Sequence, residues 1–366
     1  MKKNKPYYVF FYRFNRLFCF FILFYYKISL HCPSSSAKET SMKKSLALLL
    51  VCFFSAILMA EMRPIAKPSF GPAFNVEITP LPDQKEFRGF SIRFPSAFTT
   101  PDYPINNTVL GEIYLPLNAK PDHQTPAVQV FHTIGPDKFQ LERKVCQVLA
   151  KEGIAGIYIQ LPYFGQRGGL LGPIVIIRTE EAFFQGLEQT RADAIRANDI
   201  LLSFPEINPQ KLGAMGFSLG AFMTANAAAI DHRIQRALMI LGGGNLQEVF
   251  ATNTNETKDL LAFFSREDKQ QQEELYRKIA KYDPINCVDR LKVLARNGKC
   301  AMINAQNDNV IPPKCSKLLA EKIGCPIKWY PNVNHYTFFE HLSEAGADIR
   351  AFFKQDLPKP ATQPKN

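Results

Sequence analysis

The sequence has few of the residue patterns that hold a metal or a nucleic acid. Its six histidines are scattered along the chain, and no Cys-x-x-C or His-Cys cluster offers a zinc site. The residues after position 60 include 35 Lys/Arg and 32 Asp/Glu, and they contain neither a basic stripe nor a nucleic-acid motif. Internal repeats are also absent. We therefore expect no metal, no cofactor and no nucleic-acid partner.

No apolar run at the basic N-terminus is long enough to span a membrane. Residues 1–60 hold nine Lys/Arg and one Asp/Glu, so most of the formal net charge of +11 lies there and not in the domain that follows. The uncharged runs at residues 17–26 and 45–60 have ten and 16 residues. A spanning helix needs ~20, so neither run is expected to cross a bilayer.

Residues 42–60 have the pattern of a secretory signal peptide. Met42 and two lysines give a basic start, an apolar stretch follows, and Ala60 is a small residue at the cleavage edge. Because a signal peptide should begin a chain, the simplest interpretation makes residues 1–41 an artefact of gene calling. The alternative is a membrane-anchoring extension. On the first interpretation the mature domain, residues 61–356, is exported to the periplasm or the medium and has no membrane partner.

Five of the eight cysteines follow Ala60, and an odd number leaves at least one free thiol. An exported protein could pair two or four of them, but their spacing does not reveal which. Cys146 falls beside the apolar face of a predicted helix at residues 141–150, so we expect it in the core.

Strand-like and helical segments alternate after the leader, which predicts a mostly parallel sheet flanked by helices. Residues 87–94 and 108–115 are expected to open it as an antiparallel pair. Residues 245–297 are charged and helical without a strand signal, so they form either connecting helices or a small cap. The tail, 357–366, is rich in Pro and Lys and is expected to be disordered.

The most informative motif is Gly216-Phe217-Ser218-Leu219-Gly220, between a predicted strand at 211–215 and a predicted helix that begins at Leu219. A serine at such a strand-to-helix turn is held in a strained backbone with its hydroxyl exposed at the edge of the sheet. The two glycines remove side chains that would block the turn. The helix start offers N–H groups to a developing oxyanion. Ser218 is therefore a candidate nucleophile.

Two later residues supply a candidate acid and base in the order that this chemistry needs. Asp308 follows the strand-like run at 300–305, and His335 follows another at 326–330. The three residues are separated by 90 and 27 positions, which leaves room for the strands and helices between them. A carboxylate and a histidine past the last strands of a sheet can complete a Ser-Asp-His triad.

With these motifs the chain resembles the α/β-hydrolase superfamily, and within it the dienelactone hydrolase-like and acyl-esterase branch, over residues 85 to 355. The resemblance implies a mostly parallel eight-stranded sheet flanked by helices, with a possible small helical cap between strands 6 and 7. It implies that Ser218, Asp308 and His335 are catalytic. It also implies an oxyanion hole made by the N–H of Leu219 and an N–H after the third strand. The usual His-Gly is replaced there by His132-Thr133, and of Thr133 and Ile134 we choose Ile134 by position.

The expected function is ester hydrolysis through an acyl-enzyme on Ser218, with a small-molecule ester or an acylated carbohydrate as substrate. A serine peptidase of the prolyl-oligopeptidase type is an alternative, although that type usually has a large N-terminal propeller. Only about 25 residues separate Ala60 from the first predicted strand. A non-catalytic binding protein on the same fold is the third hypothesis. Arg167 either binds a substrate carboxylate or carbohydrate, or forms an ion pair with an acidic residue on a helix.

Overall fold

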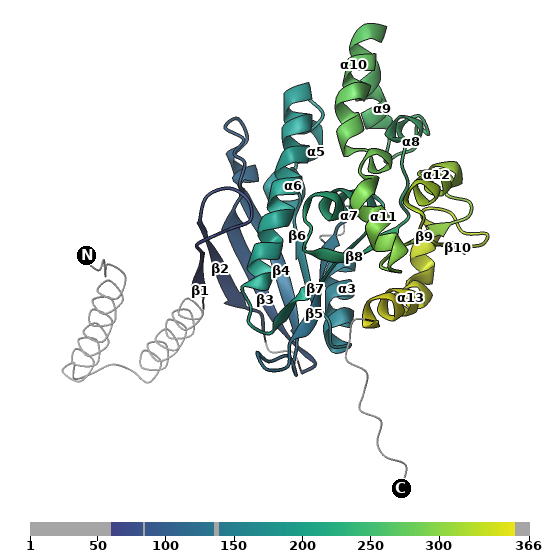
Figure 1. Cartoon of the computed structure of the whole chain (residues 1–366). Coiled ribbons are helices and arrows are strands. Elements are labelled where there is room, and N and C mark those ends of the chain that lie inside the picture. The colour runs from purple at the N-terminus through teal and green to yellow at the C-terminus, as the bar shows by residue number, and fades with distance from the viewer. Residues whose placement is uncertain (1–59, 83–84, 135–138, 356–366) are drawn as a thin grey trace, which may run out of the picture. The chain divides into compact units, whose positions relative to one another are not determined.

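The computed structural model describes residues 60–82, 85–134 and 139–355 (Figure 1). Residues 1–41, the expected signal peptide up to residue 59, and the tail at 357–366 lie outside the described residues. Within the described ranges, no helix combines the length and the apolar character needed to cross a membrane.

One ten-stranded sheet organises the domain, in the order β1-β2-β3-β4-β6-β5-β7-β8-β9-β10. Strands β1 to β4 are antiparallel, β4 pairs antiparallel with β6, and the pairs from β6 to β10 are parallel. The strands are β1 (Glu61–Ile65), β2 (Phe74–Pro80), β3 (Phe87–Pro95), β4 (Thr108–Pro116), β5 (Thr125–Phe131), β6 (Ala155–Ile159), β7 (Ile207–Phe217), β8 (Ile234–Ile240), β9 (Cys300–Ala305) and β10 (Ile327–Tyr330).

The expected count of eight strands is wrong, because β1 and β2 precede the antiparallel pair that we expected to open the sheet. Prolines and glycine punctuate residues 61–80, and such a sequence is more typical of a loop. Pro64 is nevertheless accommodated in β1, since β1 is an edge strand with one unpaired side. The fold class itself is confirmed, and the remaining eight strands keep the expected mostly parallel arrangement.

Helices cover both faces of the sheet (Figure 1). Residues alternate along β5, so that Ala127 and Phe131 pack in the core shared with α6 and α7, whereas Val128 and Val130 pack in the core shared with α3 and α13. Cys146 is fully buried on α3, as expected. The helices are α3 (Gln140–Lys151), α4 (Gly165–Gly168), α5 (Gly172–Val175), α6 (Glu180–Leu202), α7 (Leu219–Ile230), α8 (Leu246–Phe250), α9 (Lys258–Ser265), α10 (Lys269–Ile279), α11 (Val288–Arg296), α12 (Pro313–Ile323) and α13 (Leu342–Lys354), with 3-10 turns η1 (Pro104–Asn107), η2 (Ala280–Tyr282), η3 (Pro284–Asn286) and η4 (Thr337–His341).

The segment between β8 and β9 is helical throughout its regular parts, as its sequence predicts, and it divides into two portions. Helix α11 packs against α7 and the sheet, and so it is a connecting helix. Helices α9 and α10 extend beyond the ends of the strands in Figure 1. Phe263 and Phe264 of α9 pack against Phe183 near the start of α6, which anchors this outer portion to the domain.

Candidate active site

Ser218 occupies a sharp turn between the end of β7 and the first residue of α7. Its backbone has φ 53° and ψ −117°, a conformation that residues other than glycine seldom adopt. Its N–H donates to the carbonyl of Ile240, 2.9 Å away, and so the turn is tied to the end of the neighbouring strand β8. Such strain persists only where the surroundings hold it, and it concentrates at functional sites.

The two glycines of the motif are required by backbone contacts. A Cβ added to Gly216 would lie 2.4 Å from the backbone carbonyl carbon of Gly220. A Cβ on Gly220 would lie 2.2 Å from the carbonyl oxygen of Phe131, at the end of β5. Both distances are far below van der Waals contact, so the turn can pack against itself and against β5 only with glycine at these positions.

The structure brings Asp308 and His335 to Ser218, although they come from separate loops. Asp308 follows β9, and its Oδ2 lies 2.8 Å from Nδ1 of His335. The other ring nitrogen of His335, Nε2, lies 3.0 Å from the hydroxyl oxygen of Ser218. The exposed fractions of Ser218, Asp308 and His335 are 9%, 5% and 3%, so the chain of hydrogen bonds is nearly closed to water.

Asp308 is held in place by the backbone that follows it. Its Oδ1 accepts hydrogen bonds from the N–H groups of Val310 and Ile311, at 2.9 and 2.8 Å. These bonds leave Oδ2 directed at His335. If Nδ1 of His335 donates to this carboxylate, Nε2 is the ring acceptor that faces the hydroxyl of Ser218. This tautomer allows Nε2 to receive the hydroxyl proton.

Asp283 and Asp289 lie in the segment between β8 and β9, and neither belongs to the hydrogen-bonded series at Ser218. The carboxylate of Asp283 is buried, and it accepts from the N–H groups of Asn245, Leu246 and Ile285 at 3.0, 2.7 and 3.2 Å. Burial raises the pKa of Asp283. The carboxylate of Asp283 therefore fixes the chain before α8 and η3. Asp289 is exposed on α11.

The loop after β5, which should provide the second oxyanion donor, is fixed by side chains that our reasoning from the sequence missed. Nε2 of the buried His132 accepts from the N–H of Leu161 at 3.0 Å, so Nδ1 carries the proton and donates to the Thr133 carbonyl at 2.7 Å. The N–H of Thr133 donates to the carboxylate of Glu142, 3.0 Å away and fully buried on α3. Thr133 is thus engaged with Glu142, which leaves Ile134 as the better of the two candidate donors.

The remaining predicted donor, the N–H of Leu219, belongs to the first residue of α7. The first N–H groups of a helix have no partner within the helix, and they carry a partial positive charge. Ile134 is 43% exposed at the end of the described part of its loop.

The only sequence signal for Glu142 was its position as an acidic residue in the first turn of the helix that follows this loop.

Arg167 forms the ion pair that we considered, and its guanidinium is bonded within the chain. The side chain is fully buried and lies 2.7 Å from the carboxylate of Asp193 on α6. It also donates to the carbonyl oxygens of Asn106 and Gln160, at 2.8 and 2.7 Å. Asn106 in turn accepts from the N–H of Tyr163, whose φ is 67°. Arg167 therefore holds the loop after β6 in shape.

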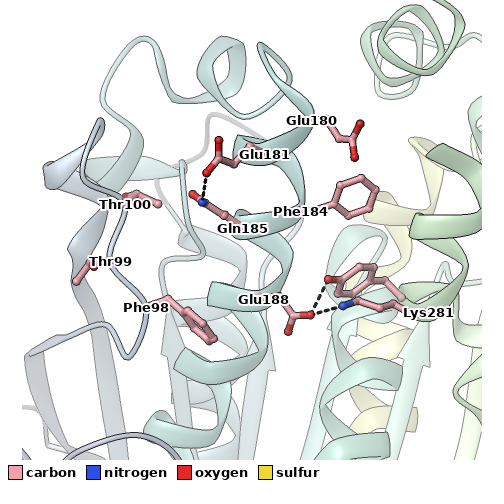
Figure 2. Close-up of a pocket in the computed structure, with 10 residues that line it drawn as sticks. Phe98, Thr99, Thr100, Glu180, Glu181, Phe184, Gln185, Glu188 and Lys281 are labelled. Atoms are coloured by element: carbon pink, nitrogen blue, oxygen red, sulfur yellow. Dashed lines mark hydrogen bonds and ion pairs between the residues drawn. The ribbon is translucent and has the colours of Figure 1, made fainter. Parts of the chain in front are cut away.

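A pocket of about 410 Å³ lies beside α6, and its lining residues do not include Ser218, Asp308 or His335 (Figure 2). Its polar groups bond mostly to one another: Glu188 accepts from Lys281 at 2.6 Å and from Tyr282 at 2.7 Å, and Glu181 accepts from Gln185 at 2.8 Å. Its acidic residues are therefore largely satisfied within the chain. Over the described residues, no group of three or more His, Cys, Asp or Glu is arranged to hold a metal.

Comparisons with known proteins give a family match over part of the chain and partial relatives. Residues 113–284 match the model of the dienelactone hydrolase family. An uncharacterized protein of Escherichia coli (strain K12), YcjY, is 30% identical over 142 residues, which are 38% of this chain and 42% of YcjY. The chain spans less than half the length of the curated relatives it matches.

Solved structures share the fold. An acetyl xylan esterase from Paenibacillus sp. R4 is 18% identical with a TM-score of 0.56, over 75% of this chain and 88% of that one. A puromycin-hydrolyzing peptidase of Mycobacterium tuberculosis is 17% identical with a TM-score of 0.52, over 78% of this chain and 46% of that one. The strand order and the solved structures lead to one conclusion: the chain has the α/β-hydrolase fold, and its residues 113–284 match the model of the dienelactone hydrolase family.

Proposed function

We propose that this protein is a serine hydrolase that cleaves carboxylic esters through an acyl-enzyme on Ser218. The observation that carries the proposal is the hydrogen-bonded series Ser218–His335–Asp308, with distances of 3.0 and 2.8 Å, at a strained turn that two glycines make possible. The match to the dienelactone hydrolase family supports the same class of reaction.

In the proposed reaction Ser218 attacks the acyl carbonyl while Nε2 of His335 takes its proton. Asp308 keeps Nδ1 protonated and stabilises the imidazolium that forms. The imidazolium then gives its proton to the leaving alcohol, and the acyl group stays on Ser218. A water molecule, deprotonated by the same nitrogen, releases the acid and restores the serine.

The tetrahedral oxyanion would be held by the N–H groups of Leu219 and Ile134. Each such donor contributes about 3–4 kcal/mol to lowering the barrier in related chemistry. The assignment of Ile134 is supported by the bond from Thr133 to Glu142, which uses the neighbouring N–H. In this proposal Glu142 orients the loop, and the peptide N–H of Ile134 acts on the reacting atoms.

A small-molecule ester or an acylated carbohydrate is the proposed substrate class. The similarity in fold to an acetyl xylan esterase agrees with this class, although at 18% identity it supports the fold alone. A peptidase is the second candidate, since a puromycin-hydrolyzing peptidase shares the fold. A non-catalytic binding protein is the third, and the intact series of hydrogen bonds speaks against it.

A substrate panel separates these candidates. Purified protein would be assayed with p-nitrophenyl esters of increasing acyl length, an acetylated xylo-oligosaccharide, a lactone and a prolyl peptide amide. We expect hydrolysis of the esters with a burst of alcohol release that reports the acyl-enzyme. Turnover of the peptide amide with no ester turnover would favour the peptidase, and no turnover of any substrate would favour the binding protein.

We also propose that the protein is exported after removal of residues up to Ala60. Amino-terminal sequencing of material from the periplasm or the medium should begin at or near Glu61. A mature protein that retains Met1 would contradict this and would support the membrane-anchoring alternative.

A further inference from the structure

Two of the described cysteines face each other across the last two strands of the sheet. The parallel register pairs Ile327 of β10 with Met302 of β9. Two residues before each of them stand Cys325 and Cys300, which are therefore opposite each other in the same register. The carbonyl of Pro326 accepts from the N–H of Met302 at 2.9 Å, so the pairing of the two chains already begins before β10 itself.

The geometry of this pair suits a covalent bond. Neighbouring strands run about 4.8 Å apart, which lies inside the range of roughly 4.4–6.8 Å between the Cα atoms of bonded cysteines. The two side chains are close enough for each thiol to shift the pKa of the other, and neither is in a disulfide in the structure. The other three described cysteines lie on α3, at the start of α11 and on α12.

The two thiols differ in reactivity, and this difference determines which of them reacts first with an oxidant. The neighbouring thiol of Cys300 lowers the pKa of the Cys325 thiol, whereas the thiol of Cys325 and burial raise the pKa of Cys300. Cys325 is half-buried, and Cys300 is only 1% exposed. Cys325 is thus the thiol that an external reagent can reach, and its thiolate is the attacking species.

We propose that Cys300 and Cys325 form an intrachain disulfide when the protein meets a disulfide oxidant such as oxidised glutathione. The Cys325 thiolate attacks one sulfur of the oxidant, which forms a mixed disulfide and expels one glutathione thiolate. Cys300 then loses its proton and attacks Sγ of Cys325, and the second glutathione leaves as a thiolate. The two cysteines lose two electrons and two protons, and one oxidised glutathione becomes two reduced ones.

The position of this bond gives it a consequence for the candidate active site. Asp308 follows the carboxyl end of β9, and His335 follows the carboxyl end of β10. Strand β10 has only four residues and lies at the edge of the sheet, where β9 is its single neighbour. A covalent link at the amino ends of both strands fixes their register and prevents β10 from separating from β9. It therefore holds Asp308 and His335 in their relative positions.

The first experiment detects the bond without any assay of activity. Purified protein is incubated with oxidised glutathione or with dithiothreitol, free thiols are blocked with N-ethylmaleimide, and peptides are mapped without reduction. We expect the oxidised sample to lose two thiols and to yield one linked peptide pair that contains Cys300 and Cys325. The variants Cys300→Ser and Cys325→Ser should lose this product, and the matched control Cys287→Ser should retain it.

Three results would overturn the proposal: unchanged thiols after oxidation, a linked pair that involves another cysteine, or glutathione that stays on Cys325 without transfer to Cys300. Because this readout does not depend on Ser218, its failure is distinguishable from a failure of the proposed hydrolase function. If Cys300→Ser fails to fold, Cys325→Ser at the half-buried position still tests the link.

The second experiment tests the effect on the strands. Oxidised wild-type protein should melt about 5 °C higher than the reduced protein, since linking distant residues restricts the unfolded chain. The double variant Cys300→Ser/Cys325→Ser should melt at the same temperature in oxidant and reductant. A linked wild-type protein with an unchanged Tm would contradict the stabilising role of the bond.

Discussion

Two loops meet at the proposed oxyanion hole, and they keep their shapes by different means. The turn after β7 is fixed by its own backbone, since Gly216 and Gly220 pack too closely for any Cβ. The loop after β5 is fixed by the side chains of His132 and Glu142, whose partners lie 29 and nine positions away in sequence. The two loops touch, because Gly220 lies against the carbonyl of Phe131.

This difference explains why the sequence predicts the structure of one loop and not that of the other. A turn that depends on glycine needs it at fixed spacing, so the pattern itself predicts the structure. A loop that is held by a buried carboxylate and a buried imidazole can be built from many sequences, because the partners need only be close in space. Substitutions in the two loops and in their neighbours should therefore lower kcat to different degrees, and they are taken from the largest expected effect to the smallest.

The largest effect is expected at the turn after β7. Ser218→Ala should lower kcat for an ester by about 10⁶-fold, because it removes the nucleophile and leaves only binding and the oxyanion donors. Circular dichroism should show an unchanged fold, since alanine fits the space of serine. A variant that keeps wild-type turnover would contradict the assignment of Ser218.

The second prediction concerns the carboxylate that orients His335. Asp308→Asn should lower kcat by roughly 10⁴-fold, because an amide can stabilise the wrong tautomer of the histidine. Asp289→Asn, at an exposed position on α11, is the matched control and should keep wild-type activity. Activity of Asp308→Asn within tenfold of the wild type would show that another residue is the acid.

The third prediction disturbs the loop after β5. Glu142→Ala removes the acceptor for the Thr133 N–H, so the donor at Ile134 should shift, and kcat should fall by on the order of 10²-fold with little change in KM. Glu142→Gln keeps an oxygen that can accept this bond and should restore most of the activity. The affinity for a boronic acid, which mimics the tetrahedral oxyanion, should fall in parallel with kcat.

A Glu142→Ala variant with full kcat would contradict a positioning role, and so would a loss of kcat that Glu142→Gln does not restore. Equal losses in kcat and in thermal stability for both variants would indicate that the carboxylate supports the fold in general.

The smallest effect on activity is expected at the loop after β6. Asp193→Asn leaves the guanidinium of Arg167 buried without a negative partner, which should cost about 3–5 kcal/mol of unfolding free energy. Because this pair does not contact the reacting atoms, kcat well below the melting temperature should stay within a few-fold of the wild type. Urea unfolding and steady-state kinetics measure the two effects separately.

The sequence predicts the central part of the fold well, because the period of its apolar residues and its turn signals are local. The strand-helix alternation, the helical segment at 245–297 and the turn at Ser218 all follow from neighbouring residues. Strands β1 and β2 were not predicted, because a sequence with prolines close together is more typical of a loop than of an edge strand. The roles of Glu142 and His132 in fixing the loop after β5, and the pairing of Cys300 with Cys325, were not predicted, since each depends on contacts that only the folded chain creates.

The most direct test of the account is to identify the residue that a fluorophosphonate probe modifies. Purified protein is treated with the probe and digested, and the modified peptide is sequenced by mass spectrometry. We expect a single adduct on Ser218, and a much slower reaction in Asp308→Asn because His335 is then misoriented. An unmodified protein, or an adduct on a different serine, would contradict the claim that Ser218 is an activated nucleophile.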